Sequence, residues 1–139
     1  MLIETTAKLI YDPIRKDLKK THKSRCLIAE LKTDDLFALY RSFIAKKYGE
    51  KFCPQAPVFK PHVTVIGPYE KIDLNKWKTK PHNGKIVKIS YSVDVEKHWK
   101  FWVLPVQSED LVNIRKEFNL DKNSWNFHIT VGRDLDWQN

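Results

Sequence analysis

The chain has 139 residues, and its 25 Lys and Arg against 17 Asp and Glu give it a formal net charge of +8. That length favours one compact domain spanning residues 1–139, large enough to bury a core without disulfides. Cys26 and Cys53 form neither a CxxC pair nor the disulfide spacing typical of a secreted protein. No stretch approaches the roughly 20 apolar residues of a membrane span, and the first ten residues lack the apolar core of a signal peptide. We therefore expect a cytoplasmic protein that acts as a monomer and does not bind membranes. The positive charge attracts anions such as nucleotides and RNA without identifying one.

The first half of the chain predicts a strand, a helix and a second strand. A short N-terminal strand is followed by a strand over 26–31, and Thr33 is expected to cap a helix that ends near Gly49. Apolar residues recur at helical spacing in that helix: Leu36, Leu39, Tyr40, Phe43 and Ile44. Three prolines between residues 52 and 61 predict a loop that leads into a β-branched strand. We expect residues 68–84 to form an irregular connection.

The second half predicts the same order of elements. Residues 85–95 alternate as a strand, residues 96–100 are expected to form a hairpin turn, and residues 101–106 form the next strand. Ser108 is then expected to cap a helix. A loop over 121–124 leads into another β-branched strand. Strand, helix and β-branched strand therefore occur twice, at about 24–67 and about 99–133, which predicts two lobes related by a pseudo-twofold axis.

Both β-branched strands carry an H-x-T tripeptide. The first lies in the run Pro61-His-Val-Thr-Val-Ile-Gly67, and the second lies in the run Phe127-His-Ile-Thr-Val-Gly-Arg133. Side chains alternate along a strand, so His62 and Thr64 share one face, and His128 and Thr130 share one face of the other strand. If the two strands are central in facing lobes, both histidines meet in one cleft.

The paired H-x-T motif resembles the two-histidine (2H) phosphoesterase superfamily, which includes RNA ligase-like (LigT-like) 2',3'-cyclic phosphodiesterases and small viral enzymes that cleave cyclic nucleotide signals. The resemblance implies an α+β fold with two pseudo-symmetric antiparallel sheet lobes and outer helices around a central cleft. It also implies that Thr64 and Thr130 bind phosphate.

The two motifs supply the groups that phosphodiester cleavage needs without a metal. One imidazole takes the proton of the attacking oxygen and the other gives a proton to the leaving oxygen, because histidine titrates near neutral pH. Hydroxyls can donate hydrogen bonds to the non-bridging oxygens, where charge accumulates. The sequence leaves open which histidine is the base. We expect no cofactor and no metal, since HExxH, a paired CxxC and a close His-x-His are all absent from the sequence.

Other residues are candidates for substrate contacts. Arg133 directly follows the second motif and either contacts the substrate phosphate or pairs with Asp134 or Asp136. Aromatic side chains can stack on nucleobases. The candidates are Tyr11, Tyr69, Trp77, Trp99, Trp102, Trp125 and Trp137. Tyr69 and Trp137 are the better ones because they lie in polar segments near the motif strands.

The compact chain looks like the small phage nucleases that degrade cyclic di- and trinucleotide immune signals, the anti-CBASS enzymes. We therefore expect a small nucleotide as substrate, with a cyclic oligonucleotide favoured over RNA ends that carry a 2',3'-cyclic phosphate. A viral enzyme of this kind would act in the host cytoplasm. The rival outside the enzymes is a basic nucleic-acid-binding module that keeps the fold without turnover.

Overall fold

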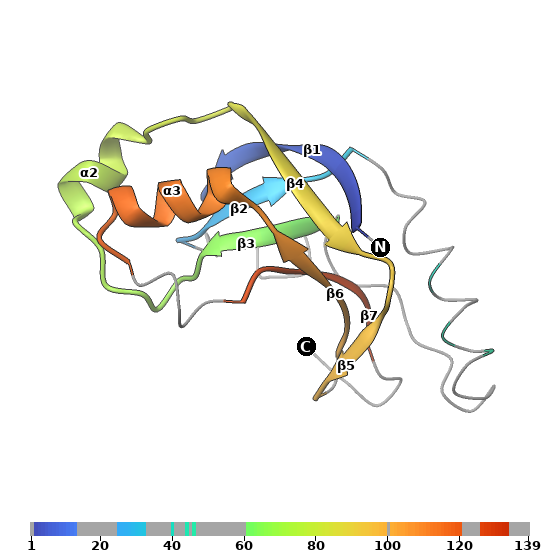
Figure 1. The fold of residues 1–139 in the computed structure, drawn as a ribbon. Helices are drawn as coiled ribbons and strands as arrows, with labels where there is room; N and C mark the ends of the chain where they lie inside the picture. The colour runs from blue at the N-terminus through green and yellow to red at the C-terminus, as the bar shows by residue number, and fades with distance from the viewer. Residues whose placement is uncertain are drawn as a thin grey trace.

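The structure is a computed structural model, and it describes residues 2–13, 25–32, 40, 44, 46, 61–99, 101–120 and 126–133. Seven strands and two helices have defined bounds in these parts of the chain (Figure 1). The strands are β1 (Leu2–Tyr11), β2 (Leu27–Glu30), β3 (His62–Ile66), β4 (Ile86–Ser92), β5 (Glu96–His98), β6 (Phe101–Gln107) and β7 (His128–Arg133). The helices are α2 (Leu74–Thr79) and α3 (Glu109–Glu117).

The strands form one sheet in the order β4-β1-β2-β3-β7-β6-β5, and every neighbouring pair is antiparallel. A further pairing between β4 and β6, with Ser90 opposite Gln107 and Tyr91 opposite Val106, joins the two sides of that sheet. In Figure 1, β4 crosses in front of β2 and β3 to reach β6. The sheet therefore curls into a barrel-like ring, from which β5 projects as an outer strand.

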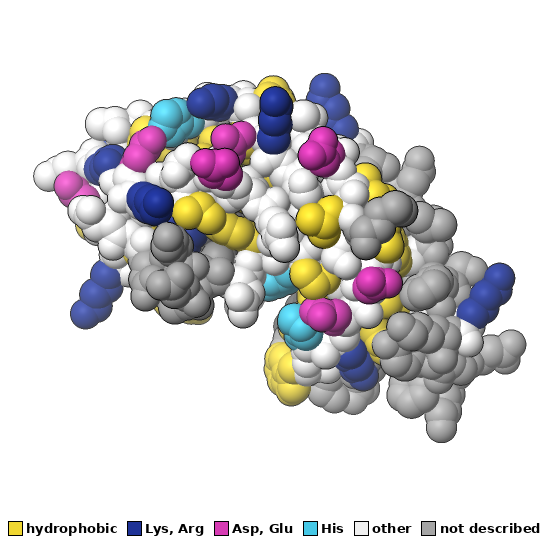
Figure 2. All heavy atoms as spheres, in the orientation of Figure 1, with side chains coloured by type: hydrophobic (Ala, Val, Ile, Leu, Met, Phe, Trp, Pro, Cys, Tyr) yellow, Lys and Arg dark blue, Asp and Glu magenta, His cyan; other side chains and the backbone are white. Residues whose placement is uncertain are grey.

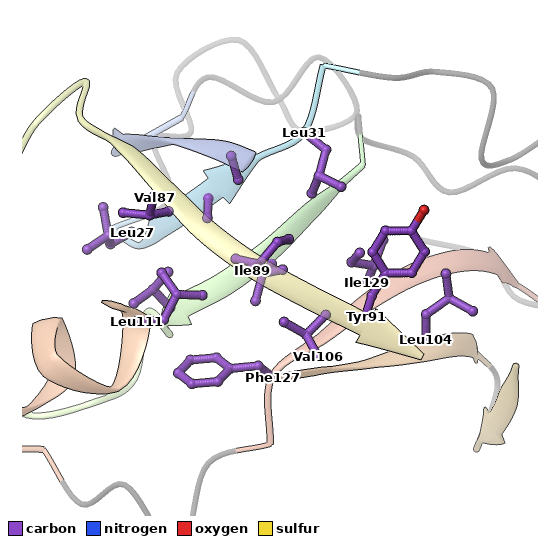
Figure 3. Packing of buried hydrophobic residues seen from close by; sticks show 14 of the residues in the cluster. Leu27, Leu31, Val87, Ile89, Tyr91, Leu104, Val106, Leu111, Phe127 and Ile129 are labelled. Atoms are coloured by element: carbon purple, nitrogen blue, oxygen red, sulfur yellow. The ribbon is translucent and has the colours of Figure 1, made fainter. Parts of the chain in front are cut away.

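Alternate residues of every strand in the ring point into a common core (Figure 3). Leu9 of β1, Val63 of β3 and Ile129 of β7 are 0% exposed. In β4 the buried residues Val87, Ile89 and Tyr91 alternate with partly or fully exposed ones. This period of two is what a strand with one buried face requires, and it fixes which side chains remain on the outer face of the ring.

Helix α3 packs on the ring through contacts with β4 and β3. Ser108 is its N-cap, as predicted, and the Ser108 hydroxyl accepts a hydrogen bond from the Leu111 amide at 3.2 Å. The apolar face of α3 places Leu111, Ile114 and Phe118 in the core.

Tyr40 and Ile44 are helical and buried, consistent with the apolar stripe of the first predicted helix, but its Thr33 cap and its end near Gly49 lie outside the described residues. None of the helices in the described ranges has the length and hydropathy of a membrane span.

Three of the predicted elements were wrong. The N-terminal strand is not short, because β1 runs for 10 residues between β2 and β4. Residues 68–84 are not wholly irregular, because Asp73 caps α2 by accepting hydrogen bonds from two backbone amides, and Trp77 of α2 is buried. Residues 96–98 are not a turn but β5, which forms by pairing with β6. The three residues of β5 are exposed and polar, so they show no hydrophobic alternation.

The α+β class and a sheet-rich fold are observed, whereas the two pseudo-symmetric lobes are not confirmed, since strands of both predicted lobes join in one ring.

One buried ion pair ties α3 to the end of β3. Arg115 is 1% exposed and donates hydrogen bonds to both carboxylate oxygens of Glu70, at 2.9 and 2.7 Å, and to the Val65 carbonyl at 2.8 Å. Glu70 also accepts a hydrogen bond from the Gly67 amide at 2.9 Å, directly after β3. Burial alone would raise the pKa of Glu70, but these hydrogen bonds and the Arg115 charge lower that pKa below its ordinary value.

We expect Glu70→Gln to lower the free energy of unfolding by about 3 kcal/mol, because it leaves a buried guanidinium without its counter-charge. Urea unfolding monitored by tryptophan fluorescence would measure this. The pKa of Glu70 is lower in the folded state than in the unfolded state, so its contribution is present above the unfolded pKa of about 4.3 and is lost as the pH falls through the folded pKa. The difference between wild type and variant should therefore shrink in acid.

Glu117→Gln is the matched control, since the pair of Glu117 with His82 leaves both side chains 41% and 33% exposed. It should cost less than about 1 kcal/mol. Equal losses for the two variants would show that the buried pair does not hold the end of β3.

Candidate active site

The two H-x-T motifs lie side by side in the structure, although 66 positions separate their histidines in the sequence. β3 and β7 are antiparallel neighbours, and Val63 lies directly opposite Ile129. In an antiparallel pair this register sets His62 opposite Thr130 and Thr64 opposite His128. Val63 and Ile129 are 0% exposed and point into the core, so the four motif side chains lie on the outer face, where all four are half-buried. The strand pairing thus brings together the four residues that the sequence singled out.

The strand register also sets an approximate spacing between the two histidines. His62 and His128 are diagonal neighbours across the strand pair, and such neighbours have Cα atoms about 7–8 Å apart. Two ring nitrogens that each contact one oxygen of a phosphate at about 2.8 Å fit this separation. Thr64 and Thr130 occupy the other diagonal. An anion above the Val63–Ile129 pair would therefore have an imidazole on two sides and a hydroxyl on the other two.

Neighbouring strands fix the start of each motif strand. The Leu31 amide donates to the Pro61 carbonyl at 2.9 Å, next to His62, and the Val106 amide donates to the Phe127 carbonyl at 2.9 Å, next to His128. His128 is also oriented through its ring, because its Nδ1 lies 3.0 Å from the Asn126 carbonyl oxygen. A carbonyl can only accept, so Nδ1 carries the hydrogen, and Nε2 is the atom that can take up or release a proton.

Glu30, which lies beside His62 on this face, is not among the residues predicted from the sequence. Glu30 of β2 is directly opposite His62, and Lys8 of β1 is directly opposite Glu30. Side chains paired in this way have Cβ atoms about 4.5–5.5 Å apart. Glu30 is the last residue of β2, and the sequence gives no sign of which strand pairs with β3. Knowledge of the order of the strands was needed to find it.

A hollow of about 580 Å³ opens beside His128. β5, β6, the beginning of α3 and the beginning of β7 form its walls, which include Glu96, His98, Pro105 and Asn126. Pro105 is directly opposite His128, so the hollow continues the face that carries the motifs. In Figure 2, histidine and acidic side chains gather around the recess at the lower centre of the molecule. A substrate larger than a single phosphate would find room here.

The other predicted contact residues have different positions. Tyr69 is 96% exposed in the turn that follows β3, so its ring is accessible to a ligand in solution. The prediction for Tyr11 is not supported by its position: its ring is 6% exposed and belongs to the core cluster, on the opposite side of the sheet from the motifs. The Tyr11 hydroxyl donates to the Pro81 carbonyl at 2.7 Å, and its ring meets Trp77 edge to face at 4.8 Å. Trp137 and the Arg133 side chain lie outside the described residues.

The remaining tryptophans divide into buried and exposed ones. Trp77 and Trp102 are 6% and 1% exposed and therefore do not offer a face to a base. Trp99 is 69% exposed in the turn between β5 and β6, where its φ is 57°. Trp125 lies outside the described residues. Within the described ranges, no group of three His, Cys, Asp or Glu side chains could hold a metal ion.

The hydrogen bond between His128 and Asn126 predicts one tautomer. Neutral His128 should carry its hydrogen on Nδ1, because the Asn126 carbonyl accepts it. Long-range ¹H–¹⁵N correlation spectra of the neutral form of His128 would measure this. Exposed His82 has an Nε2 atom 2.9 Å from a Glu117 oxygen and should show the opposite tautomer in the same spectrum. An Nε2–H tautomer of His128 would contradict the orientation given above.

A comparison with known families matches the part of the chain that carries both motifs. The family model described as "Swiss Army Knife, 2H phosphoesterase domain" matches residues 39–135, a segment that contains both H-x-T motifs and all strands from β3 to β7. Comparisons with curated proteins and with solved structures gave no significant match. The family match covers more than half of the 139 residues and includes the strand pair that positions the four motif side chains. The chain therefore belongs to the 2H phosphoesterase family.

Proposed function

We propose that the protein is a metal-independent phosphodiesterase that cleaves the 3',5'-phosphodiester bonds of cyclic oligonucleotides by acid–base catalysis with His62 and His128. Membership of the 2H phosphoesterase family supports phosphodiesterase chemistry in general. The observation that carries the proposal is the pairing of Val63 with Ile129, which sets both imidazoles and both hydroxyls on one outer face. The compact chain and its net charge of +8 suit a small anionic substrate.

In the proposed reaction, one neutral imidazole takes the proton of the attacking oxygen, which belongs either to water or to a ribose 2'-hydroxyl. The attacking oxygen forms its bond to phosphorus as the bond from phosphorus to the leaving oxygen breaks. The other imidazole, protonated at the start, gives its proton to the leaving oxygen. A hydroxyl nucleophile yields a 2',3'-cyclic phosphate, and water yields a phosphate monoester. Exchange of protons with solvent then restores the two histidines.

The two threonines act on the charge of the phosphoryl group. Thr64 lies next to His128 across the strands, and Thr130 lies next to His62, so each hydroxyl is close to one proton-transfer group. Hydrogen bonds from these hydroxyls to the non-bridging oxygens stabilise the charge that builds up in the transition state. Arg133, Tyr69 and Trp137 complete the proposed substrate contacts, with Arg133 on the phosphate and the aromatic rings on the bases. Tyr11 is left out because it is buried.

We expect His62→Ala and His128→Ala each to lower the cleavage rate by about 10²- to 10⁴-fold, the usual contribution of a positioned general acid or base. The far-ultraviolet circular dichroism spectrum and the melting temperature should remain close to those of the wild type. His82→Ala is the matched control, because His82 is an exposed histidine paired with Glu117 away from the two motifs. EDTA should leave the wild-type rate unchanged. Nucleotide binding without cleavage by the wild type would support a binding module instead.

A panel of substrates tests the class of nucleotide. The panel contains 3',5'-linked and 2',5'-linked cyclic dinucleotides, cyclic trinucleotides and RNA that ends in a 2',3'-cyclic phosphate. We expect the 3',5'-linked cyclic compounds to be cleaved fastest, as followed by chromatography of the products. Cleavage confined to the RNA ends would overturn this preference and assign the protein to the RNA-processing phosphodiesterases.

A further inference from the structure

The hollow beside His128 differs in charge from the rest of the chain. The chain carries a net charge of +8, yet the residues that line the hollow include the carboxylates of Glu96 and Glu109. No lysine or arginine lines it among the residues that the structure describes. Two carboxylates disfavour a second phosphate group in this space. A phosphate bound at the motif histidines would therefore direct a neutral part of the substrate into the hollow.

The walls of the hollow combine apolar surface with hydrogen-bonding groups. Pro105, Val112 and Phe127 supply apolar surface, and Gln107 and Asn126 supply amides. A volume of about 580 Å³ lies within the range of small-molecule sites, which is about 300–1,000 Å³. Apolar walls with a few polar groups suit a ribose and a base better than they suit an anion. His128 stands at the edge of the hollow, so a nucleoside there can be attached directly to the phosphorus atom.

The two carboxylates are not equivalent. Glu96 already accepts a hydrogen bond from His98, with Oε2 3.2 Å from the Nε2 of His98. Glu109 is exposed in the first turn of α3. A carboxylate accepts hydrogen bonds and donates none, so it pairs with an amine on a base and repels a carbonyl oxygen at the same position. Glu109 is therefore the group that can distinguish an amine from a carbonyl.

We propose that the hollow between β5, β6, β7 and α3 binds the nucleoside on the His128 side of the scissile phosphate, and that Glu109 selects a base with an exocyclic amine. The proposal rests on the proposed function, because it takes the motif histidines as the position of the phosphate. It names the substrate class more closely: the nucleoside on this side is cytidine, adenosine or guanosine rather than uridine.

Pairs of nucleotides that exchange the exocyclic amine for a carbonyl, and with it an accepting ring nitrogen for an N–H, test the proposal by binding rather than by cleavage. The pairs are cytidine and uridine 3'-monophosphates, and adenosine and inosine 3'-monophosphates. ¹H–¹⁵N correlation spectra of the wild-type protein would give the dissociation constants and the amides that shift. We expect cytidine and adenosine nucleotides to bind about tenfold more tightly than their partners, with shifts at Gln107, Asn126 and His128.

Variants then identify the selecting residue. Glu109→Gln should bring the two affinities of each pair to within about twofold, because an amide can donate to a carbonyl as well as accept from an amine. Glu4→Gln is the matched control, since Glu4 is an exposed carboxylate of β1 that does not line this hollow. It should keep the full preference. Glu96→Gln should retain most of it.

Equal binding of both members of each pair by the wild type, or a preference that survives in Glu109→Gln, would overturn the proposal. So would nucleotide-induced shifts confined to other parts of the chain. None of these results depends on turnover, so the loss of cleavage in His62→Ala and His128→Ala would still support the proposed phosphodiesterase. Conversely, unimpaired cleavage in those two variants would refute the phosphodiesterase mechanism even if the base preference were observed.

Discussion

The candidate active site depends on one contact between strands, the pairing of Val63 with Ile129. Because residues alternate between the two faces of a strand, this pairing determines at once that the apolar residues of both motifs point inwards and that the histidines and threonines point outwards. A slip of one residue in either strand would send one histidine into the core. The hydrophobic pattern that builds the core therefore also places the histidines and threonines of both motifs on one face.

The surroundings hold that strand pair in place and give its two sides different characters. Arg115 and Glu70 fix the end of β3 from within the molecule, and main-chain hydrogen bonds from β2 and β6 fix the start of each motif strand. On the outer face, Glu30 lies beside His62 and Lys8 lies beyond Glu30 on the next strand, whereas the hollow with its two carboxylates adjoins His128. The two histidines thus face different electrostatic environments.

The sequence predicted the parts of this arrangement that depend on local pattern. The alternation of His62 to Val65 and of His128 to Val131 predicted two half-buried strands, and Ser108 marked the start of α3. The parts that depend on pairing were missed. β5 contains only Glu96, Lys97 and His98 and exists because β6 lies beside it, and Glu30 and the hollow became visible only once the order of the strands was known. Tyr11 was misjudged because its burial results from contacts with Trp77 and Pro81, some 70 positions away.

The pairing of β4 with β6 has a consequence for the behaviour of the protein at high concentration. Sheets with open borders can add strands from other copies, which is a route to aggregation. Here β1, β2, β3, β4, β6 and β7 each pair with strands on both sides over at least part of their length, so within the described residues β5 is the strand that has a partner on one side only. That strand is three residues long, and all of its side chains are exposed and polar. Length and hydrophilicity together make it a poor template for the growth of fibrils.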